Sequence, residues 1–234
     1  MLRGLYTAAS AMVAQLARQD VYANNLANAN SVGFRRGRSA LGQFDDSLRA
    51  AKESTGKASA GAAAGAADID LAQGALLQTG RPLDMAISGD AFFSVRTPKG
   101  TVYTRDGRLQ LDSQSRLTTL QGDLVLGERG PITLPTGELA VAQNGEISCG
   151  GQVVDRLRLA VPVKPTALGN NLYSAQRITT PKASTVSSGM LEQANVNAVQ
   201  EMGRMLNGYR YYEAGATALR YQDETLTSLM KTLQ

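Results

Sequence analysis

The sequence predicts an α+β protein in which an amphipathic helix at each end of the chain flanks a central β-rich region. Two observations predict this class. Apolar residues near both ends recur at alternating three- and four-residue spacings, the pattern of helices that pack against other helices. Between them, short apolar or alternating runs are separated by turn-forming residues, the pattern of β-hairpins. We therefore expect the two helices to form a coiled-coil-like domain and the middle of the chain to form a β-rich hairpin domain.

Residues 1–30 are predicted to form the N-terminal assembly helix. Neither Gly nor Pro occurs between Gly4 and Gly33, and Gly33 can end the helix. The Asn-rich stretch 24–30 weakens the helix, because Asn side chains compete for nearby backbone groups; helix capping and a ligand site are the two interpretations of it. One heptad position is polar, Gln19. The expected assembly seam consists of the apolar heptad positions Leu2, Leu5, Ala9, Met12, Leu16, Ala23 and Leu26.

Residues 31–71 are expected to form a loop or linker that contains an Ala/Gly-rich low-complexity segment at 57–67. The β-rich core domain is predicted at 72–181, followed by an extended connection at 182–197. The expected strands are Met85–Ile87, Phe92–Arg96, Val102–Arg105, Leu109–Leu111, Leu117–Leu120 and Leu124–Leu126. The expected turns are Gly89-Asp90, Pro98-Lys99-Gly100, Asp106-Gly107, Gly122-Asp123, Asn144-Gly145 and Gly150-Gly151. Asp106-Gly107 is a strong hairpin signal, because the favoured two-residue turn needs positive φ at both positions.

Residues 198–234 are predicted to form the C-terminal assembly helix. Asn197 can cap its first turn, and Gln200 completes a capping-box pattern. The expected seam of this helix is Met202, Met205, Tyr209, Tyr212, Ala216, Leu219, Leu226, Met230 and Leu233. Asp223 also falls on the seam, where it could set the register, pair with a neighbouring subunit or lie exposed.

Gly208 and Gly215 lie seven residues apart on a stripe beside this seam. Glycine costs helix stability and returns no side-chain contact, so a compensating reason is expected. We predict a close helix contact at both glycines; simple exposure is the alternative.

The two end helices could instead pack on the β domain as a single globule, because amphipathic helices usually serve their own core. With separate domains, the ends are mobile in the dilute monomer, and proteolysis leaves a resistant fragment within 72–185.

Composition excludes several kinds of site. The chain has 234 residues, no His and a single cysteine, Cys149, so histidine-based catalysis, histidine metal sites, thiolate zinc sites and an internal disulfide are excluded. Four aspartates, Asp68, Asp70, Asp84 and Asp90, lack the spacing of a calcium loop. We expect no catalytic residue, no cofactor, no metal and no membrane span, since no apolar run approaches about 20 residues.

The 24 Lys and Arg are interspersed with 20 Asp and Glu, which argues against a nucleic-acid partner. The cluster Arg35-Arg36-Gly37-Arg38 is interpreted as a solvated face or an intersubunit contact. At the N-terminus, Arg3 and the apolar stretch 5–17 are similar to a secretory signal, but Thr7 and other polar residues interrupt it. We expect no cleaved signal peptide.

Four motifs occur in an order that spans nearly the whole chain. The residues Asn24, Asn25, Leu26, Ala27 and Asn28, followed by Gly33 and Phe34, resemble the N-terminal signature of bacterial flagellar rod and hook proteins. The segment 189–197, which ends in Asn195, Val196 and Asn197, resembles their C-terminal signature of a small residue, Glu and then Asn-Val-Asn. The segments 81–93 and 103–107 resemble the core motifs of the same family. Within it, the segments 125–132 and 195–199 are more similar to the proximal rod type than to the distal rod type.

The resemblance implies a structural subunit of the flagellar basal-body rod that is not an enzyme. It implies export through the flagellar type III apparatus and self-assembly through paired terminal helices into the helical axial drive shaft, which transmits motor torque across the periplasm to the hook. The implied partners are copies of this chain, other rod proteins, the export apparatus, and peptidoglycan or ring proteins around the rod. The alternatives are a non-polymerising flagellar adaptor and a rod-associated enzyme that remodels the cell wall.

Overall fold

The computed structural model describes residues 2–39, 68–181 and 184–232, so the Ala/Gly-rich segment at 57–67 lies outside the described residues. The chain divides into two compact units. The helical unit comprises residues 1–27, 37–68 and 197–234, and the β unit comprises 28–36 and 69–196. Both expected helices and a central β-rich region are present, which confirms the α+β class.

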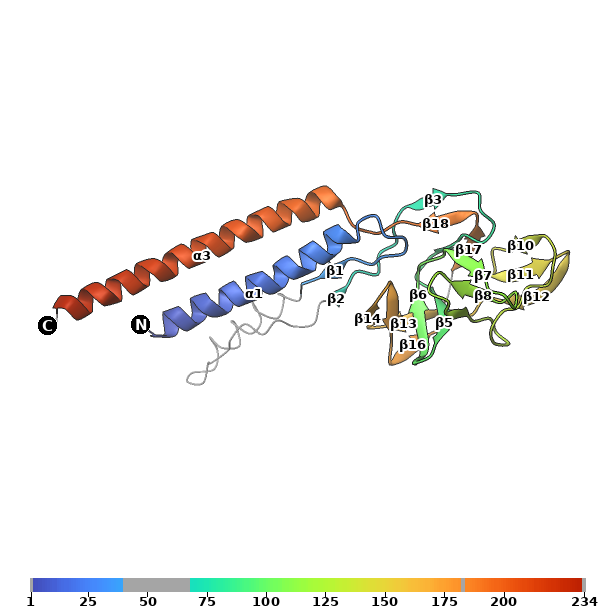
Figure 1. The fold of residues 1–234 in the computed structure, drawn as a ribbon, viewed down its shortest axis with the longest axis horizontal. Helices are drawn as coiled ribbons and strands as arrows, with labels where there is room; N and C mark the ends of the chain where they lie inside the picture. The colour runs from blue at the N-terminus through green and yellow to red at the C-terminus, as the bar shows by residue number, and fades with distance from the viewer. Residues whose placement is uncertain (1, 40–67, 182–183, 233–234) are drawn as a thin grey trace. The chain divides into compact units, whose positions relative to one another are not determined.

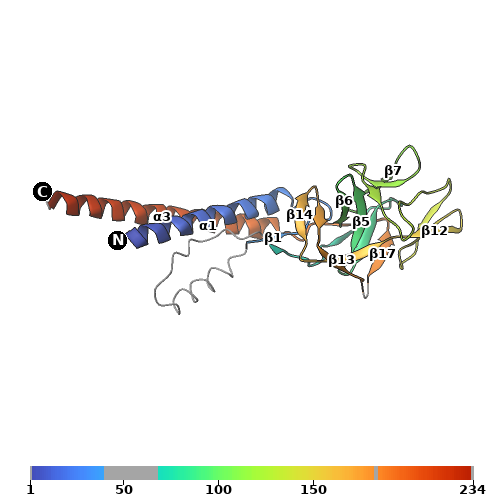
Figure 2. The same cartoon turned by 90° about the horizontal axis from the view of Figure 1, so that it is seen from below.

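The helical unit consists mainly of α1 (Leu2–Ala27) and α3 (Ala198–Thr232), which lie side by side and run antiparallel (Figures 1 and 2). The start of α3 is capped as the sequence predicts: the Gln200 amide donates to Asn197 Oδ1 at 3.1 Å, and the Glu201 amide donates to the Asn197 carbonyl at 3.0 Å. The first bond satisfies an amide that has no partner within the helix, and the second is the first backbone hydrogen bond of the helix itself.

The other regular elements of the described residues are eighteen strands, of which β1 and β2 pair with each other. Their bounds are β1 Gly37–Arg38, β2 Asp68–Ile69, β3 Leu76–Gln78, β4 Met85–Ser88, β5 Phe92–Thr97, β6 Gly100–Thr104, β7 Leu109–Leu111, β8 Leu117–Thr119, β9 Leu124–Val125, β10 Leu139–Val141, β11 Glu146–Cys149, β12 Gln152–Arg156, β13 Leu159–Val163, β14 Thr166–Gly169, β15 Leu172–Ser174, β16 Arg177–Thr179, β17 Thr185–Ser188 and β18 Met190–Glu192.

The β unit is built around a nine-stranded sheet in the order β14-β15-β6-β5-β9-β8-β7, with β13 pairing with both β5 and β16. A separate three-stranded sheet has the order β10-β11-β12. Two-stranded pairs, β17 with β4 and β18 with β3, involve strands from both ends of the unit.

Strand β5 has a core on each of its faces, because side chains alternate along a strand. Phe93 and Val95 belong to the larger aliphatic core, and Phe92 belongs to a smaller cluster with Tyr103 and Tyr173. Burial on both faces explains why Phe92–Val95 is a continuous buried run and not an alternating one.

Most of the predicted hairpins are confirmed. The strands on either side of Pro98-Lys99-Gly100, Gly122-Asp123, Asn144-Gly145 and Gly150-Gly151 pair antiparallel. Gly150 and Gly151 both have positive φ, 58° and 81°, which is the backbone geometry that two-residue hairpin turns favour.

The predicted hairpin at Asp106-Gly107 is wrong. Strand β6 pairs with β5 and β15, whereas β7 pairs with β8, so the strands on either side of this dipeptide are not partners. Gly107 serves a close approach: a Cβ there would overlap the Met85 carbonyl oxygen and lie 2.7 Å from its carbon. The Met85 amide in turn donates to the Gly107 carbonyl at 2.9 Å.

The β unit extends beyond 72–181. Two strands, β17 and β18, lie within 182–197, where the sequence indicates only an extended connection. Residues 28–36, from the expected end of the first helix and the start of the linker, also belong to the β unit. Residues 28–36 and strands β17 and β18 therefore belong to the same domain although they are far apart in the sequence.

Candidate functional site

Part of the inner face of the helix pair is polar. Gln15 of α1 is 9% exposed, and Gln19 Nε2 donates to the Met205 carbonyl of α3 at 3.2 Å. A Cβ at Gly208 would lie 2.7 Å from Gln19 Oε1 and closer still to Gln15 Nε2. The two glutamine side chains therefore occupy the space that Gly208 leaves on α3.

Gly215 lies opposite Met12, two helical turns after Gly208 on α3. A Cβ at Gly215 would lie 3.3 Å from Met12 Cγ and 3.7 Å from its sulfur, whereas a Cβ at Gly203 would meet nothing within 4 Å. Two of the three glycines of α3 thus face α1 of the same chain.

The outer faces of both helices carry large apolar side chains. On α3, Val199, Met202, Leu206 and Tyr209 are 78%, 53%, 55% and 55% exposed, and they follow one another at intervals of three, four and three residues. On α1, Val13 and Leu16 are 58% and 50% exposed. We call these six residues the outer stripe.

The structure separates the predicted seam residues between these two faces. Met12 faces α3, Leu16, Met202 and Tyr209 belong to the outer stripe, and Ala23 and Asp223 are exposed. Five others are half-buried: Leu26, Met205, Tyr212, Ala216 and Leu219. The side chains of Leu2, Leu5, Ala9, Leu226 and Met230 lie outside the described part of the two helices, and Leu233 lies outside the described residues.

Asn25, within the N-terminal family motif, connects three parts of the helical unit. Its side chain is 1% exposed and pairs with the Gly37 backbone in both directions, accepting from the amide at 2.8 Å and donating to the carbonyl at 2.9 Å. Nδ2 also lies 3.3 Å from Glu201 Oε2 of α3. Glu201 is 1% exposed and forms an ion pair with Arg204.

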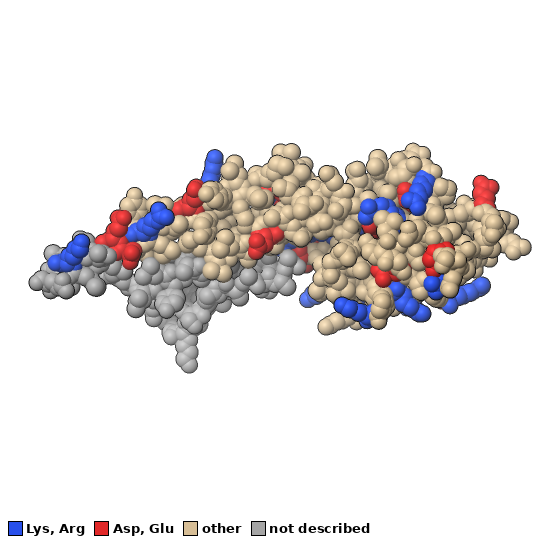
Figure 3. All heavy atoms as spheres, viewed as in Figure 1, with Lys and Arg blue, Asp and Glu red and all other residues tan. Residues whose placement is uncertain are grey.

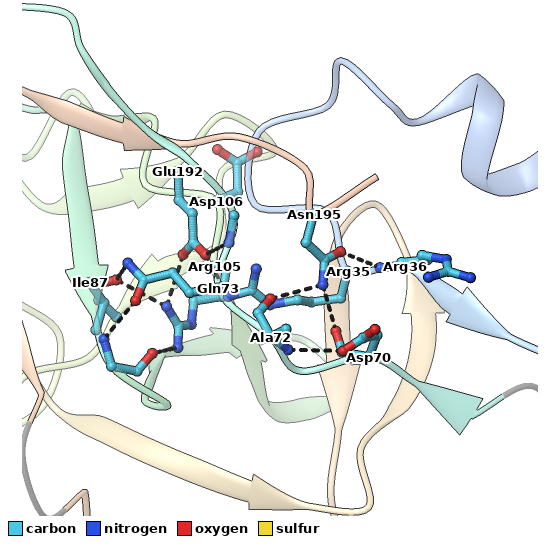
Figure 4. Close-up of polar contacts among 12 residues, drawn as sticks. Arg35, Arg36, Asp70, Ala72, Gln73, Ile87, Arg105, Asp106, Glu192 and Asn195 are labelled. Atoms are coloured by element: carbon cyan, nitrogen blue, oxygen red, sulfur yellow. Dashed lines mark hydrogen bonds and ion pairs between the residues drawn. The ribbon is translucent and has the colours of Figure 1, made fainter. Parts of the chain in front are cut away.

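Asn195, within the C-terminal family motif, connects three segments of the β unit. Its Oδ1 accepts from the Arg36 amide at 2.7 Å, and its Nδ2 donates to the carbonyls of Asp70 and Ala72 at 2.9 and 2.8 Å (Figure 4). The Asn195 amide donates to the Phe34 carbonyl at 3.4 Å. The chain therefore enters and leaves the β unit along neighbouring segments.

Glu192 lies at the centre of a buried cluster of charges (Figure 4). Its Oε1 accepts from Arg35 Nη2 at 2.7 Å and from the Gly74 amide at 2.8 Å, and its Oε2 accepts from Arg105 Nη1 at 2.8 Å. The three charged side chains are all fully buried. A buried carboxylate is tolerated only when it is paired and hydrogen-bonded, as here.

Both arginines of this cluster also face the ring of Phe92. The guanidinium carbon of Arg35 lies 5.9 Å from the ring centroid and that of Arg105 lies 4.9 Å from it. Burial lowers the pKa of Arg105 to about 10 although Glu192 opposes this shift, and the nearby Arg35 lowers it further. Arg105 also donates to the carbonyls of Ile87 and Gly89.

Tyr173 completes the aromatic side of the cluster. Its hydroxyl accepts from the Arg35 amide at 3.1 Å, and its ring meets that of Phe92 edge-on at 5.7 Å. Burial raises the pKa of the Tyr173 hydroxyl, and the hydrogen bond from Arg35 opposes this shift.

Sequence reasoning missed the partners of this cluster. Glu192 and Arg105 stand within the quoted motifs at 189–197 and 103–107, so the motifs marked the positions but not the contact between them. The cluster at 35–38 is predicted from the sequence to be a solvated face or an intersubunit contact, and for Arg35 this is wrong because its side chain is fully buried within the chain. An ionisable residue inside a family motif is the signal that could have identified it.

The described residues suggest no other kind of site. Among them there is no cluster of three or more potential metal ligands, and no helix is long and apolar enough to span a membrane. On the face seen in Figure 3, acidic and basic side chains are intermixed over both units. This distribution gives no support for a nucleic-acid surface.

Three family models match the chain. They are the flagella basal body rod protein model at residues 5–35, the flagellar hook protein FlgE/F/G D1 domain at 86–154, and the flagellar basal body rod FlgEFG protein C-terminal model at 187–232. The matched ranges include most of α1, the middle of the β unit and the segment from the end of β17 through α3.

The chain also aligns with curated relatives along nearly its whole length. It is 35% identical to the flagellar basal-body rod protein FlgF of Mesorhizobium japonicum, with 100% of this chain and 98% of the relative covered. It is 35% identical to FlgF of Escherichia coli, with 91% of each chain covered. Its identity to the flagellar basal-body rod protein FlgG of Bacillus subtilis is 29%, with 98% of each chain covered.

Proposed function

As this chain belongs to the family of flagellar basal-body rod proteins, which are structural proteins of the motility apparatus and not enzymes, we propose that it self-assembles through its terminal helices. Copies of the chain, with other rod proteins, form the helical axial drive shaft that transmits motor torque across the periplasm to the hook. The outer stripe of the helix pair is the surface through which subunits join.

The observation that carries this proposal is the exposure of the outer stripe. Monomeric soluble proteins rarely expose a contiguous row of large apolar side chains, and such a row usually marks an interaction surface. Met202, Leu206 and Tyr209 on α3 are each more than half exposed in the single chain. Their three- and four-residue spacing is the one by which helices pack against helices.

The contacts on the inner face are consistent with the same proposal. Gln15 and Gln19 form a polar contact with α3 near Gly208, and Met12 forms an apolar one at Gly215, while the outer stripe stays exposed. Burial of apolar area is the main favourable contribution to helix packing, so covering the outer stripe requires a partner outside the single chain. Helices of neighbouring subunits are the proposed source.

The test is a variant that changes only the outer stripe. Leu206→Glu combined with Met202→Glu places two charges on the stripe and leaves the inner face of the helix pair unchanged. We expect the purified variant to keep the circular-dichroism spectrum of the parent chain, to lose concentration-dependent assembly, and to be absent from isolated basal bodies. Gln222→Glu, at an exposed polar position of α3, is the matched control.

Normal incorporation of the double variant into basal bodies would exclude the outer stripe as the joining surface. A parent chain that remains monomeric at all concentrations, alone and with other rod proteins, would favour the non-polymerising adaptor.

Export without signal cleavage, assembly with other rod proteins and the proximal rod position are parts of the same proposal. A chain that lacks residues 202–234 should still be exported, because the proposed export signal lies near the N-terminus, but it should not enter the rod. Mass spectrometry of the protein in isolated basal bodies tests whether the N-terminus is intact, and labelling it there tests its position along the rod.

A further inference from the structure

We propose that Glu192 is a closure lock of the β unit, so that the segments 30–36, 70–78 and 189–196 dock and undock together in one step. All three segments meet at this side chain or at its backbone. Arg35 belongs to the first segment, Gly74 to the second and Glu192 to the third. The Gly33 amide also donates to the Glu192 carbonyl at 2.7 Å.

Many hydrogen bonds join the three segments to one another. Among the described strands β18 pairs with β3 alone, the Gln193 amide donates to the Ala75 carbonyl at 2.8 Å, and Asn195 joins Phe34, Arg36, Asp70 and Ala72 through the bonds described above. Strands β3 and β18 are not part of the nine-stranded sheet. Two hydrogen bonds attach the first segment to that sheet: the Arg35 amide donates to the Tyr173 hydroxyl of β15 at 3.1 Å, and Nδ2 of Asn171, the residue before β15, donates to the Val32 carbonyl at 2.8 Å.

The Arg105 side chain attaches the third segment to the same sheet. Arg105 follows directly after β6, an interior strand of the nine-stranded sheet, and it donates to Glu192 Oε2 at 2.8 Å. Glu192 thus joins a residue fixed by the sheet to the Arg35 side chain of the first segment. Loss of this one carboxylate removes the common partner of both arginines.

The charge balance makes the docking cooperative. Arg35 and Arg105 face the same Phe92 ring, and both side chains are fully buried. Without Glu192, two like charges would lie close together in a buried environment. Asp90 would then attract Arg105 only weakly. Leaving a buried charge without its partner is strongly unfavourable, and this cost exceeds the contribution of the two hydrogen bonds from Tyr173 and Asn171, so the segment with Arg35 undocks when the segment with Glu192 leaves.

Closure of the β unit consequently fixes both connections to the helices. Residues 28–36 follow α1 directly, and Glu192 precedes the capping residue Asn197 by five positions. A β unit whose last segment is missing or detached also releases its first segment. Because of Glu192, both connections are docked only when the last segment of the β unit is present and in place.

Hydrogen exchange on the full chain, read by mass spectrometry, tests the lock. In Glu192→Gln we expect exchange to accelerate about 10²- to 10³-fold in all three segments together, corresponding to the loss of a buried ion-pair partner. Strands β5 and β6 should keep most of their protection. Glu138→Gln, which changes an exposed carboxylate of the same unit, is the matched control and should leave exchange unchanged.

A second variant separates the charge effect from general damage. Arg35→Met in the Glu192→Gln background removes one uncompensated cation, so it should restore at least tenfold protection in segment 70–78 relative to Glu192→Gln alone. This comparison also applies if Glu192→Gln alone does not fold, since the double variant should then recover the folded β unit.

Three results would overturn the proposal. In the first, 189–196 exchanges fast in Glu192→Gln while 30–36 stays protected. In the second, protection falls equally throughout the β unit. In the third, Arg35→Met adds to the damage and gives no recovery.

Discussion

Gly107 packs directly against the Met85 carbonyl, and this contact leaves no space for a side chain at position 107. A Cβ there would lie 2.7 Å from the Met85 carbonyl carbon and closer still to its oxygen. Met85 is itself fully buried at the start of β4, and its amide donates to the Gly107 carbonyl. The two backbones are therefore held together from both sides.

Gly107→Ala should destabilise the β unit by about 3 kcal/mol, at the upper end of the cost of overpacking, because backbone and not a flexible side chain must move. Urea unfolding followed by tyrosine fluorescence measures this change. Ser113→Ala, at an exposed position, should change the free energy of unfolding by less than about 0.5 kcal/mol. An equally small effect for Gly107→Ala would show that the chain can separate here at little cost.

The three glycines of α3 should respond differently to substitution. Gly203→Ala should stabilise the helix by about 1 kcal/mol, because a Cβ there meets nothing. Gly208→Ala should gain less or destabilise, because Gln15 and Gln19 must be displaced, and Gly208→Leu should break the inner face. Gly215→Ala should fall between them, because Met12 can adjust.

Thermal melting of the helical circular-dichroism signal gives this order directly. The exposure alternative makes the opposite prediction: all three alanine variants stabilise the helix by similar amounts, and Gly208→Leu and Gly215→Leu leave motility intact. Normal motility in both leucine variants would contradict the close contact in the assembled state.

Asn25→Ala should destabilise the helical unit by about 1.5–3 kcal/mol, because it removes the side-chain oxygen that accepts from the Gly37 amide and one hydrogen bond to the buried Glu201 carboxylate. Asn25→Asp should be worse, since a carboxylate would then face both the Gly37 carbonyl and Glu201. Loss of helical signal with temperature provides the measurement, and Asn30→Ala, at an exposed position, is the control. If Asn25→Asp were as stable as the parent chain, the buried amide would have no specific role.

The contribution of Tyr173 to stability should be lost as the pH rises above about 10, whereas Arg105, whose pKa is lowered to about 10 in the folded chain, acts in the opposite direction. The pKa of Tyr173 is raised in the folded chain above its usual value of 10.0, so the unfolded chain loses this proton at a lower pH than the folded chain does. The contribution of Tyr173 to stability is therefore complete below pH 10 and is lost as the pH rises through its folded-state pKa. Urea midpoints at a series of alkaline pH values report this loss.

Tyr173→Phe should weaken this pH dependence while costing about 1 kcal/mol near neutrality for the lost hydrogen bond to the Arg35 amide. Tyr211→Phe, at an exposed position on α3, should retain the dependence. An unchanged alkaline loss in Tyr173→Phe would assign it to another group.

Limited trypsin digestion should leave residues 185–196 with the resistant β unit, because β17 and β18 pair with β4 and β3. We expect the C-terminal boundary of the resistant material at Arg204 or Arg210 of α3, and not within 72–185 as the sequence alone predicts. Release of residues 185–196 before cleavage within α3 would contradict a β unit that extends to 196.

Local chemistry determined much of this fold. Periodic apolar residues without Gly or Pro predicted α1, and Asn197 with Gln200 predicted the start of α3. Gly150-Gly151 predicted its hairpin because glycine adopts positive φ at little cost, and this turn requires it twice. Such elements depend on residues close together in the sequence, so they can be predicted without the tertiary structure.

Long-range contacts determined the rest. Glu192 meets Arg105 and Arg35 across 87 and 157 residues, and no local pattern could have paired them. The same applies to Asp106-Gly107, whose neighbouring strands have partners elsewhere in the sheet.

Periodicity alone did not determine how the two helices pack against each other. The heptad pattern gave the spacing of apolar residues on α1 and α3, but not which stripe faces the partner helix within the chain. The structure places Gln15 and Gln19 against Gly208 and leaves Leu16 outside. The choice between two adjacent stripes depends on the shape of the opposing surface, and only the tertiary structure brings the two surfaces together.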